Sequence, residues 1–281
     1  MTALSALLVV VLVLSIALPV LFGDRIAQRV KLAVNQNVDA HVDWRDAGLS
    51  VLKNFPHLTL TLDDLTTVGT GRFQNDTLAA VRHVGVVLDV TSVLGNVMGG
   101  KPIVIRAIEL ERPRLTLVVL EDGSANWDIT KKSAAQAPPE TSKPFAVSLR
   151  RFEISNASIG FDNRQSKLTA GLIGFNQTLS GDLSQDKVAI LTRAHVDTAT
   201  VTFAGITYLN HVTLGLDADV QADLANKRYT LTKTELSLND LKLAVAGSVA
   251  SDNQRMALDL AFKAPSTNFR SILSLVPAIY A

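Results

Sequence analysis

Two segments decide the fold of this chain: FPHLTLTLDDL at residues 55–65 and PRLTLVVLEDGSANW at residues 113–127. In the first, leucine occupies every second position from Leu58 to Leu62. In the second, apolar residues occupy every second position from Leu115 to Val119, and the turn-forming pair Asp122-Gly123 follows. Alternation with a period of two residues is typical of a β-strand with one apolar and one polar face. We therefore predict β-sheet here, and the residues show no pattern of a reaction centre.

Five short motifs in this region resemble the AsmA family. They occur in that family's order and spacing and are Phe55-Pro56, Asp76-Thr77-Leu78-Ala79, Ser92-Val93-Leu94, Ile108-x-Leu110-x-x-Pro113-x-Leu115 and Asp122-Gly123-x-x-Asn126-Trp127. The resemblance implies a protein that is anchored in the bacterial inner membrane and extends into the periplasm. It also implies a relationship to bridge-like lipid transfer proteins, whose chorein-type end opens a β-groove lined with apolar side chains.

The implied fold is mainly β: an N-terminal transmembrane helix, a long antiparallel curved sheet that forms an open apolar groove, and few short helices. The implied function is cell-envelope and outer-membrane biogenesis, by phospholipid transport between the inner and outer membranes along the groove. The residues expected to line the groove are the apolar ones of the alternating strands, namely Leu58, Leu60, Leu62, Val86, Leu88, Leu115, Leu117 and Val119.

Composition narrows the possible partners. Hydrophobic residues make up 47% of the 281 residues but aromatic residues only 5%, so the apolar surface is aliphatic and offers few stacking platforms. The net charge is +1, from 27 basic and 26 acidic residues, which argues against nucleic acid as a partner. The chain has no cysteine, which excludes disulfides and thiolate metal sites.

Residues 2–22 carry no charge and are long enough, at about 1.5 Å per residue, to cross a hydrocarbon core of about 30 Å. A cleaved signal peptide would have a shorter apolar region, a basic start and a small-x-small cleavage site. Here no Lys or Arg precedes the segment, and residues 18–22 are bulky. We predict a retained anchor, with a buried core helix as the alternative. The anchor residues are Leu4, Leu7, Leu8, Val11, Leu12, Leu14 and Leu18.

The orientation of the anchor rests on two opposing arguments. Arg25, Arg29 and Lys31 follow the segment, and the positive-inside rule would place that flank in the cytoplasm. Large domains translocate largely regardless of such charges, and the resemblance implies a periplasmic body. We therefore expect a single-pass inner-membrane protein with its N-terminus in the cytoplasm and everything from Asp24 onward in the periplasm.

A proline-rich stretch at residues 134–144 (AAQAPPETSKP) divides the rest of the chain and is predicted to be a linker or a long loop. The predicted domains are the anchor at 1–23, a chorein-type β region at 24–133, this linker, and a continuing β-groove region at 145–281. The last region is expected to be truncated at its C-terminus, so that the chain is a piece of a longer protein.

The remaining elements follow from periodicity and turn residues. Helices are predicted at 24–36, 91–98 and 269–280, a connector at 49–55 and a turn at 162–163. Strands are predicted at 40–45, 58–63, 84–90, 103–110, 115–119, 145–149, 152–159, 188–196, 201–207, 212–222, 229–238, 241–250 and 256–262.

No motif predicts catalytic residues, a metal site or a cofactor. Gly95-x4-Gly100-Lys101 matches most of a phosphate-binding loop, but Pro102 stands where Ser or Thr would bind magnesium. The adjacent carboxylates Asp63-Asp64 and Glu121-Asp122 are predicted at strand ends, where neighbours point to opposite faces. No two histidines have a metal-ligand spacing; they are His41, His57, His83, His195 and His211. We expect a non-enzymatic protein.

Two hypotheses remain for the sheet. In an open sheet with so few helices, one face needs a cover, and lipid can supply it. The partners would then be the membrane and phospholipid. In a closed sandwich, two sheets bury each other, and the protein would be a structural scaffold that recruits envelope proteins through its sheet edges. The resemblance favours the groove.

Overall fold

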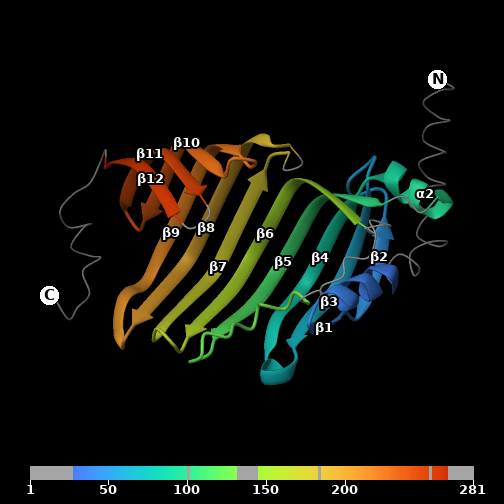
Figure 1. Cartoon of the computed structure of the whole chain (residues 1–281), viewed down its shortest axis with the longest axis horizontal. Coiled ribbons are helices and arrows are strands. Elements are labelled where there is room, and N and C mark those ends of the chain that lie inside the picture. The colour runs from blue at the N-terminus through green and yellow to red at the C-terminus, as the bar shows by residue number, and fades with distance from the viewer. Residues whose placement is uncertain (1–27, 100–101, 132–144, 183–184, 253–254, 265–281) are drawn as a thin grey trace. The chain divides into compact units, whose positions relative to one another are not determined.

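The computed structural model of the chain describes residues 28–99, 102–131, 145–182, 185–252 and 255–264 (Figure 1). In this part, twelve strands form one antiparallel sheet with the hydrogen-bonded order β1-β3-β4-β5-β6-β7-β8-β9-β10-β11-β12, and β2 pairs with β3. Because almost every strand pairs with the next one along the chain, the sheet is a meander. The predicted class, mainly antiparallel β with few helices, is confirmed.

The elements have the following bounds. The strands are β1 (Ala40–Asp43), β2 (Asp46–Ser50), β3 (Leu58–Gly69), β4 (Thr77–Leu88), β5 (Ile103–Val119), β6 (Phe145–Asn163), β7 (Leu168–Ser180), β8 (Lys187–Phe203), β9 (Ile206–Asp223), β10 (Arg228–Leu238), β11 (Leu241–Asp252) and β12 (Arg255–Lys263). The helical elements are a helix over residues 28–37, the 3-10 turn η1 (Gly71–Phe73) and α2 (Val90–Gly99).

Several predicted boundaries are wrong. The connector predicted at 49–55 overlaps β2, and β7 was not predicted at all. Residues 162–163, predicted as a turn, belong to β6, and the turn lies at 164–167. Two pairs of predicted strands are single long strands in the structure, namely β5 and β6. The predicted strand at 201–207 spans the end of β8, a turn at 204–205 and the start of β9.

Other predictions fall outside the described residues. These are the anchor at 2–22, the linker at 134–144, the helix at 269–280 and part of the glycine-containing loop at 95–101. Within the described residues, no helix is both long enough and apolar enough to cross a membrane.

The chain divides into two compact units. The first comprises Met1–Leu110 and Asp128–Ser148, and the second comprises Glu111–Trp127 and Leu149–Ala281. The predicted domain boundaries at 23, 133 and 144 stay predictions. The two units are described separately below.

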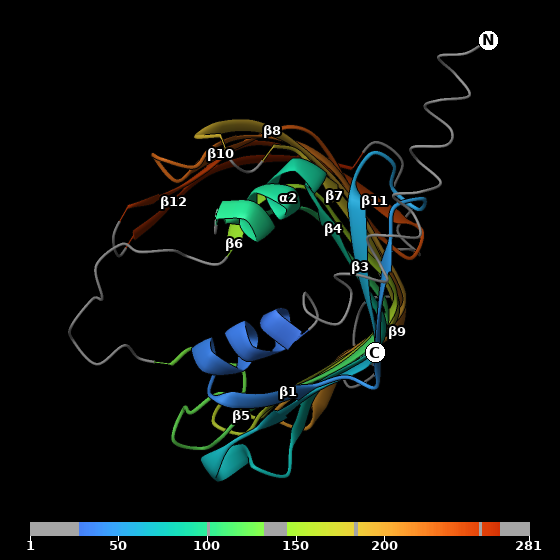
Figure 2. The ribbon, with the colours of Figure 1, turned by 90° about the vertical axis from the view of Figure 1, so that its right-hand side faces the viewer.

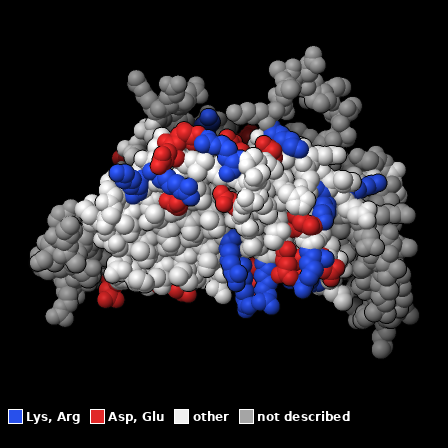
Figure 3. Space-filling view, turned by 90° about the horizontal axis from the view of Figure 1, so that it is seen from below, with Lys and Arg blue, Asp and Glu red and all other residues white. Residues whose placement is uncertain are grey.

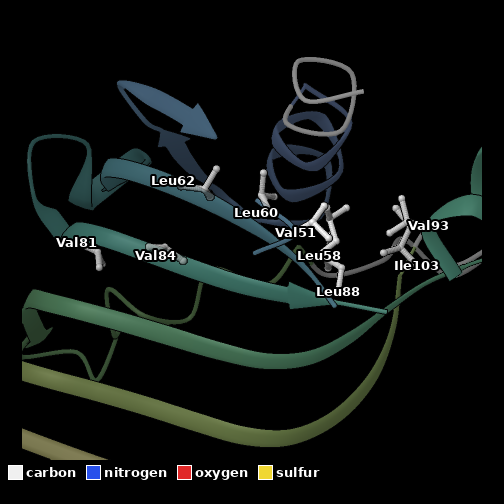
Figure 4. Close-up of a cluster of buried hydrophobic side chains, with 9 residues drawn as sticks. All are labelled: Val51, Leu58, Leu60, Leu62, Val81, Val84, Leu88, Val93 and Ile103. Carbon is white, nitrogen blue, oxygen red and sulfur yellow. The ribbon is translucent and has the colours of Figure 1, made fainter. Parts of the chain in front are cut away.

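The first unit has a packed aliphatic core on one face of β3 and β4. Leu58, Leu60 and Leu62 pair across the sheet with Leu88, Val86 and Val84, so all six side chains point to the same side. Two helices cover that side, because Val30 of the helix over 28–37 and Val93 of α2 belong to the same cluster (Figures 2 and 4). The members drawn in Figure 4 are Val51, Leu58, Leu60, Leu62, Val81, Val84, Leu88, Val93 and Ile103.

Asparagine side chains complete the hydrogen bonding of strand backbones in both units. In the first unit, the Asn35 amide donates to the Val42 carbonyl and accepts from the Val42 N–H, each at 2.9 Å. In the second unit, buried Asn126 accepts from the N–H of Val118 at 3.0 Å and donates to the carbonyl of Thr116 at 2.7 Å. Each asparagine therefore satisfies backbone groups that a neighbouring strand would otherwise pair.

The motif Asp122-Gly123-x-x-Asn126-Trp127 has a structural role in the second unit. The Gly123 N–H donates to the Leu120 carbonyl at 3.0 Å, which closes the predicted turn. Trp127 follows Asn126 and packs against Phe161 of β6, with ring centroids 6.0 Å apart.

Helix α2 begins with a side-chain cap. Asp89 accepts hydrogen bonds from the Thr91 hydroxyl and from the Ser92 backbone N–H, the latter at 3.0 Å, and the Arg106 guanidinium lies 3.0 Å from its other oxygen. These hydrogen bonds and the Arg106 charge lower the pKa of Asp89 to about 2. The cap fixes where β4 ends and α2 starts.

Bulges interrupt the long strands of the second unit. The register shifts between Ile154 and Ala157 in the β6–β7 pairing, and between Val196 and Ala199 in the β8–β9 pairing. A backbone with positive φ marks the bulge positions Asn156, Gly174 and His211. One extra residue in a strand would turn all later side chains to the opposite face, whereas a bulge absorbs that residue and bends the strand.

The bulges preserve one continuous apolar face. Leu172 and Phe175, which flank the bulge of β7, both pack against the cluster of Val196, Ala199 and Val212. Without the bulges, residues three apart in a strand would point to opposite sides of the sheet.

We predict that Gly174→Ala destabilises the second unit. Gly174 has φ +67°, and an added Cβ would overlap the Asp197 carboxylate, so the free energy of unfolding should fall by at least about 1 kcal/mol. The matched control is Gly171→Ala in the same strand, where a Cβ meets nothing within 4 Å, and its effect should stay within about 0.5 kcal/mol. Urea denaturation followed by circular dichroism measures both. Equal losses for the two variants would contradict the role assigned to the bulge.

Candidate binding surface on strands β8 to β12

One face of β8–β11 is aliphatic from strand to strand. Ala194 of β8 pairs with Leu216, Leu216 with Leu236, and Leu236 with Leu243. The next row along the strands runs through Val196, Leu214, Leu238 and Leu241. Because paired residues of antiparallel strands point to the same side, these two rows form one surface.

The surface is hollowed. A cavity of about 360 Å³ lies over the two rows, within the range of roughly 300–1,000 Å³ typical of ligand sites. Its wall is formed by Ala194, Val196, Leu214, Gly215, Leu216, Leu236, Ser237, Leu238 and Leu243. Among these residues only Ser237 has a polar side chain, and because Ser237 alternates with Leu236 and Leu238, that side chain points to the opposite face. Such a wall offers dispersion contacts and shape, with almost no hydrogen bonding.

The aliphatic face continues onto β12. Leu258 pairs with Val249, and Phe262 pairs with Val245, and both β12 side chains are mostly exposed. Leu236 at the cavity is 38% exposed. In the described part of the second unit, no helix lies over these strands. Exposed apolar surface of this extent marks a binding site or an interface.

The opposite face of the same strands is polar. Arg193 lies 3.0 Å from Asp217, and Lys242 lies 3.1 Å from Glu235. These residues precede or follow the aliphatic ones by a single position, as the two-residue period requires. The charges are paired and of both signs, and on the face drawn in Figure 3 basic and acidic side chains also lie beside one another. The ion pairs of the polar face therefore do not form a basic patch that would bind a polyanion.

The eight predicted groove residues lie on β3, β4 and β5 and not on β8–β12. Leu58, Leu60, Leu62 and Leu88 are buried in the helix-covered core of the first unit, and Val86 packs against that core. Leu115 and Leu117 are half-buried, and Val119 is buried, in the part of β5 that belongs to the second unit. A lipid-lining role for these residues stays a prediction. In this structure the four leucines line a packed core rather than an open surface.

Sequence reasoning predicted strands over most of β8–β12 but did not select their apolar residues as a site. The available signal was the alternation itself: Leu214 and Leu216 in β9, and Leu236 and Leu238 in β10, alternate with charged or small polar positions. What the sequence did not indicate was which alternating strands would be covered by helices and which would not.

The described titratable residues form turns and ion pairs. Asp63 and Asp64 lie within β3, not at its end as predicted; Asp63 is 2.7 Å from His83, and Asp64 is 3.1 Å from Arg45. The side chain and backbone N–H of Asn226 donate to Asp223 and lower the pKa of that carboxyl. Within the described residues, no three His, Asp or Glu side chains gather as metal ligands.

The closed-sandwich hypothesis requires a second sheet against this face. The described strands form a single sheet, and its order ends at β12 without returning to the first strands. The described residues therefore supply no second sheet to bury the aliphatic rows of β8–β11.

We predict that Leu236→Asp preserves the fold, whereas Leu60→Asp does not. Leu60 is 1% exposed, so a carboxylate there would be buried without a partner, and the unfolding free energy should fall by several kcal/mol. A carboxylate at position 236 can be hydrated from the exposed side, and the expected loss is about 1 kcal/mol or less. Circular dichroism during urea denaturation of the two variants compares them. A Leu236→Asp variant as unstable as Leu60→Asp would show that the face is closed in solution.

Comparison with known proteins agrees with the motifs. No curated protein matches the chain. The AsmA family model matches residues 1–279, nearly the whole chain, and membership in this family suggests a function related to the cell envelope. On this match, the chain belongs to the AsmA family.

Proposed function

We propose that this protein binds phospholipid acyl chains on the aliphatic face of β8–β12 and carries them away from the inner membrane towards the outer membrane. The observation that carries the proposal is the hollow of about 360 Å³ whose wall is formed by aliphatic side chains of β8–β11. The envelope-related family supports a lipid among the possible apolar ligands.

The chemistry of the wall favours a saturated chain over other apolar ligands. Burying a methylene group contributes about 0.8 kcal/mol, so an acyl chain that lies along several residues gains a useful affinity without hydrogen bonds. The wall is built of Leu, Val and Ala, with no aromatic ring for stacking. The absence of charge on this wall leaves the lipid headgroup to the solvent side.

The cellular arrangement is part of the proposal. Residues 2–22 would hold the chain in the bacterial inner membrane, with the N-terminus in the cytoplasm and the strands in the periplasm. The support is the uncharged apolar segment and the resemblance of the motifs to an inner-membrane family. No chemical step is required of the protein, because acyl-chain transfer breaks no covalent bond.

Site-specific photo-crosslinking in cells tests the proposal. With benzoylphenylalanine in place of Leu236, ultraviolet light should produce a lipid adduct that mass spectrometry identifies, because this side chain lies on the aliphatic face. The matched control is Glu235, the preceding residue, which points to the opposite face and pairs with Lys242. Adducts at 236 but not at 235 are expected. Absence of lipid adducts at 236, or equal adducts at both positions, would overturn the proposal.

A further inference from the structure

Helix α2 is a surface helix without a charged residue. Its sequence is VTSVLGNVMG. The first turn has no acidic residue, and the last turn has no basic residue. Val93 faces the core of the first unit, while Leu94 is partly exposed and Met98 is 80% exposed. Helices that face water usually carry charges on the side opposite the core. The outer side of α2 is instead suited to an apolar environment.

The first unit exposes further apolar side chains. They lie in the segment that follows Val51, and Val51 belongs to the same core cluster as Val93 of α2 (Figure 4). Leu52 is mostly exposed, and Phe55 is 55% exposed. We call Leu52, Phe55, Leu94 and Met98 the α2 surface patch.

The segment that contains Leu52 and Phe55 has little charge. Lys53 is the only Lys, Arg, Asp or Glu among residues 51–57, and its amine lies 3.2 Å from the Glu109 carboxylate. A paired lysine with a long aliphatic stem is compatible with an apolar interface.

The patch is tethered close to the predicted anchor. The helix over 28–37 follows Phe22 after only a short connection, which at about 3.5 Å per residue spans roughly 20 Å at most. Near the start of that helix, the Arg29 guanidinium donates to the Asn96 side chain of α2 at 3.2 Å. If residues 2–22 cross the bilayer, α2 therefore cannot lie far from the membrane surface.

We infer that the α2 surface patch inserts into the interface of the bilayer from which the protein takes lipid. The inference rests on the proposed function, because it uses the membrane anchor. A bilayer fits the patch better than a protein partner does, since the patch has aliphatic and aromatic side chains, no charge of its own, and a short tether to the apolar segment. Insertion would hold the first unit against the membrane.

The absence of cysteine allows a direct depth measurement on the full chain. Met98→Cys and, separately, Leu94→Cys are labelled with nitrobenzoxadiazole and reconstituted in vesicles of phosphatidylcholine and phosphatidylglycerol. The matched control is Leu191→Cys, an aliphatic residue 46% exposed on the polar face of β8. Quenching by lipids spin-labelled below the headgroup is compared with quenching by iodide present on both sides of the membrane.

The expected result is lipid quenching several-fold stronger at 98 and 94 than at 191, with the reverse order for iodide. Iodide quenching at 98 and 94 equal to that at 191 would overturn the inference. Energy transfer between labels at 98 on different copies, without lipid quenching, would also overturn it and would identify a contact between copies.

The same vesicles separate this inference from the proposed function. Lipid adducts from benzoylphenylalanine at 236, together with a water-exposed label at 98, would refute membrane insertion of the patch and retain acyl-chain binding. A membrane-buried label at 98 without adducts at 236 would retain the patch and refute the lipid site on β8–β12.

Discussion

The structure of the second unit depends on keeping the aliphatic rows of its long strands on one face of the sheet. A single extra residue would turn the rest of a strand over. The bulges at Asn156, Gly174 and His211 absorb such residues, and Leu172 and Phe175 therefore reach the same cluster although they are three positions apart. The bulges require a positive φ at these three positions, a conformation that only glycine adopts without strain. The same bulges keep Arg193 and Asp217 on the polar side.

The same alternating pattern of apolar residues produces a different result in each unit. In the first unit, Val30 and Val93 bring helices onto the leucines of β3, so the pattern produces a packed core. In the described part of the second unit, the rows that contain Leu216 and Leu236 have no such cover, so the pattern produces a hollowed surface. Covered and uncovered strands have the same alternating sequence pattern. Whether such strands form a core or a candidate lipid site depends on the presence of a helix that covers them.

The sequence could predict features that depend on near neighbours, but not the covering of a strand by a distant helix. The strand class, α2 and the turn at Asp122-Gly123 followed from local periodicity and turn residues, which depend on near neighbours. Strand β7 was missed because its bulge spaces Leu168, Leu172, Phe175 and Leu179 by four, three and four residues, a pattern closer to that of a helix. Periodicity did not indicate that helices would cover Leu58 and Leu60, because helix cover is a long-range contact. The family was predicted from short motifs. The hydrogen bonds that residues of these motifs make to the backbone, such as those of Asn126, are shown only by the structure.

The central claim is that the uncovered face of β8–β12 holds acyl chains. It is tested most directly by quantifying phospholipid bound to the full chain after detergent extraction from membranes, by mass spectrometry of an organic extract. Leu216→Asp places a charge on the aliphatic face, and Leu191→Asp places the same charge on the opposite face and leaves the anchor and its surrounding lipid unchanged. The account predicts that the unsubstituted chain and Leu191→Asp retain lipid that Leu216→Asp loses while remaining folded. Equal lipid in all three proteins, or none beyond that of the membrane segment, would contradict it.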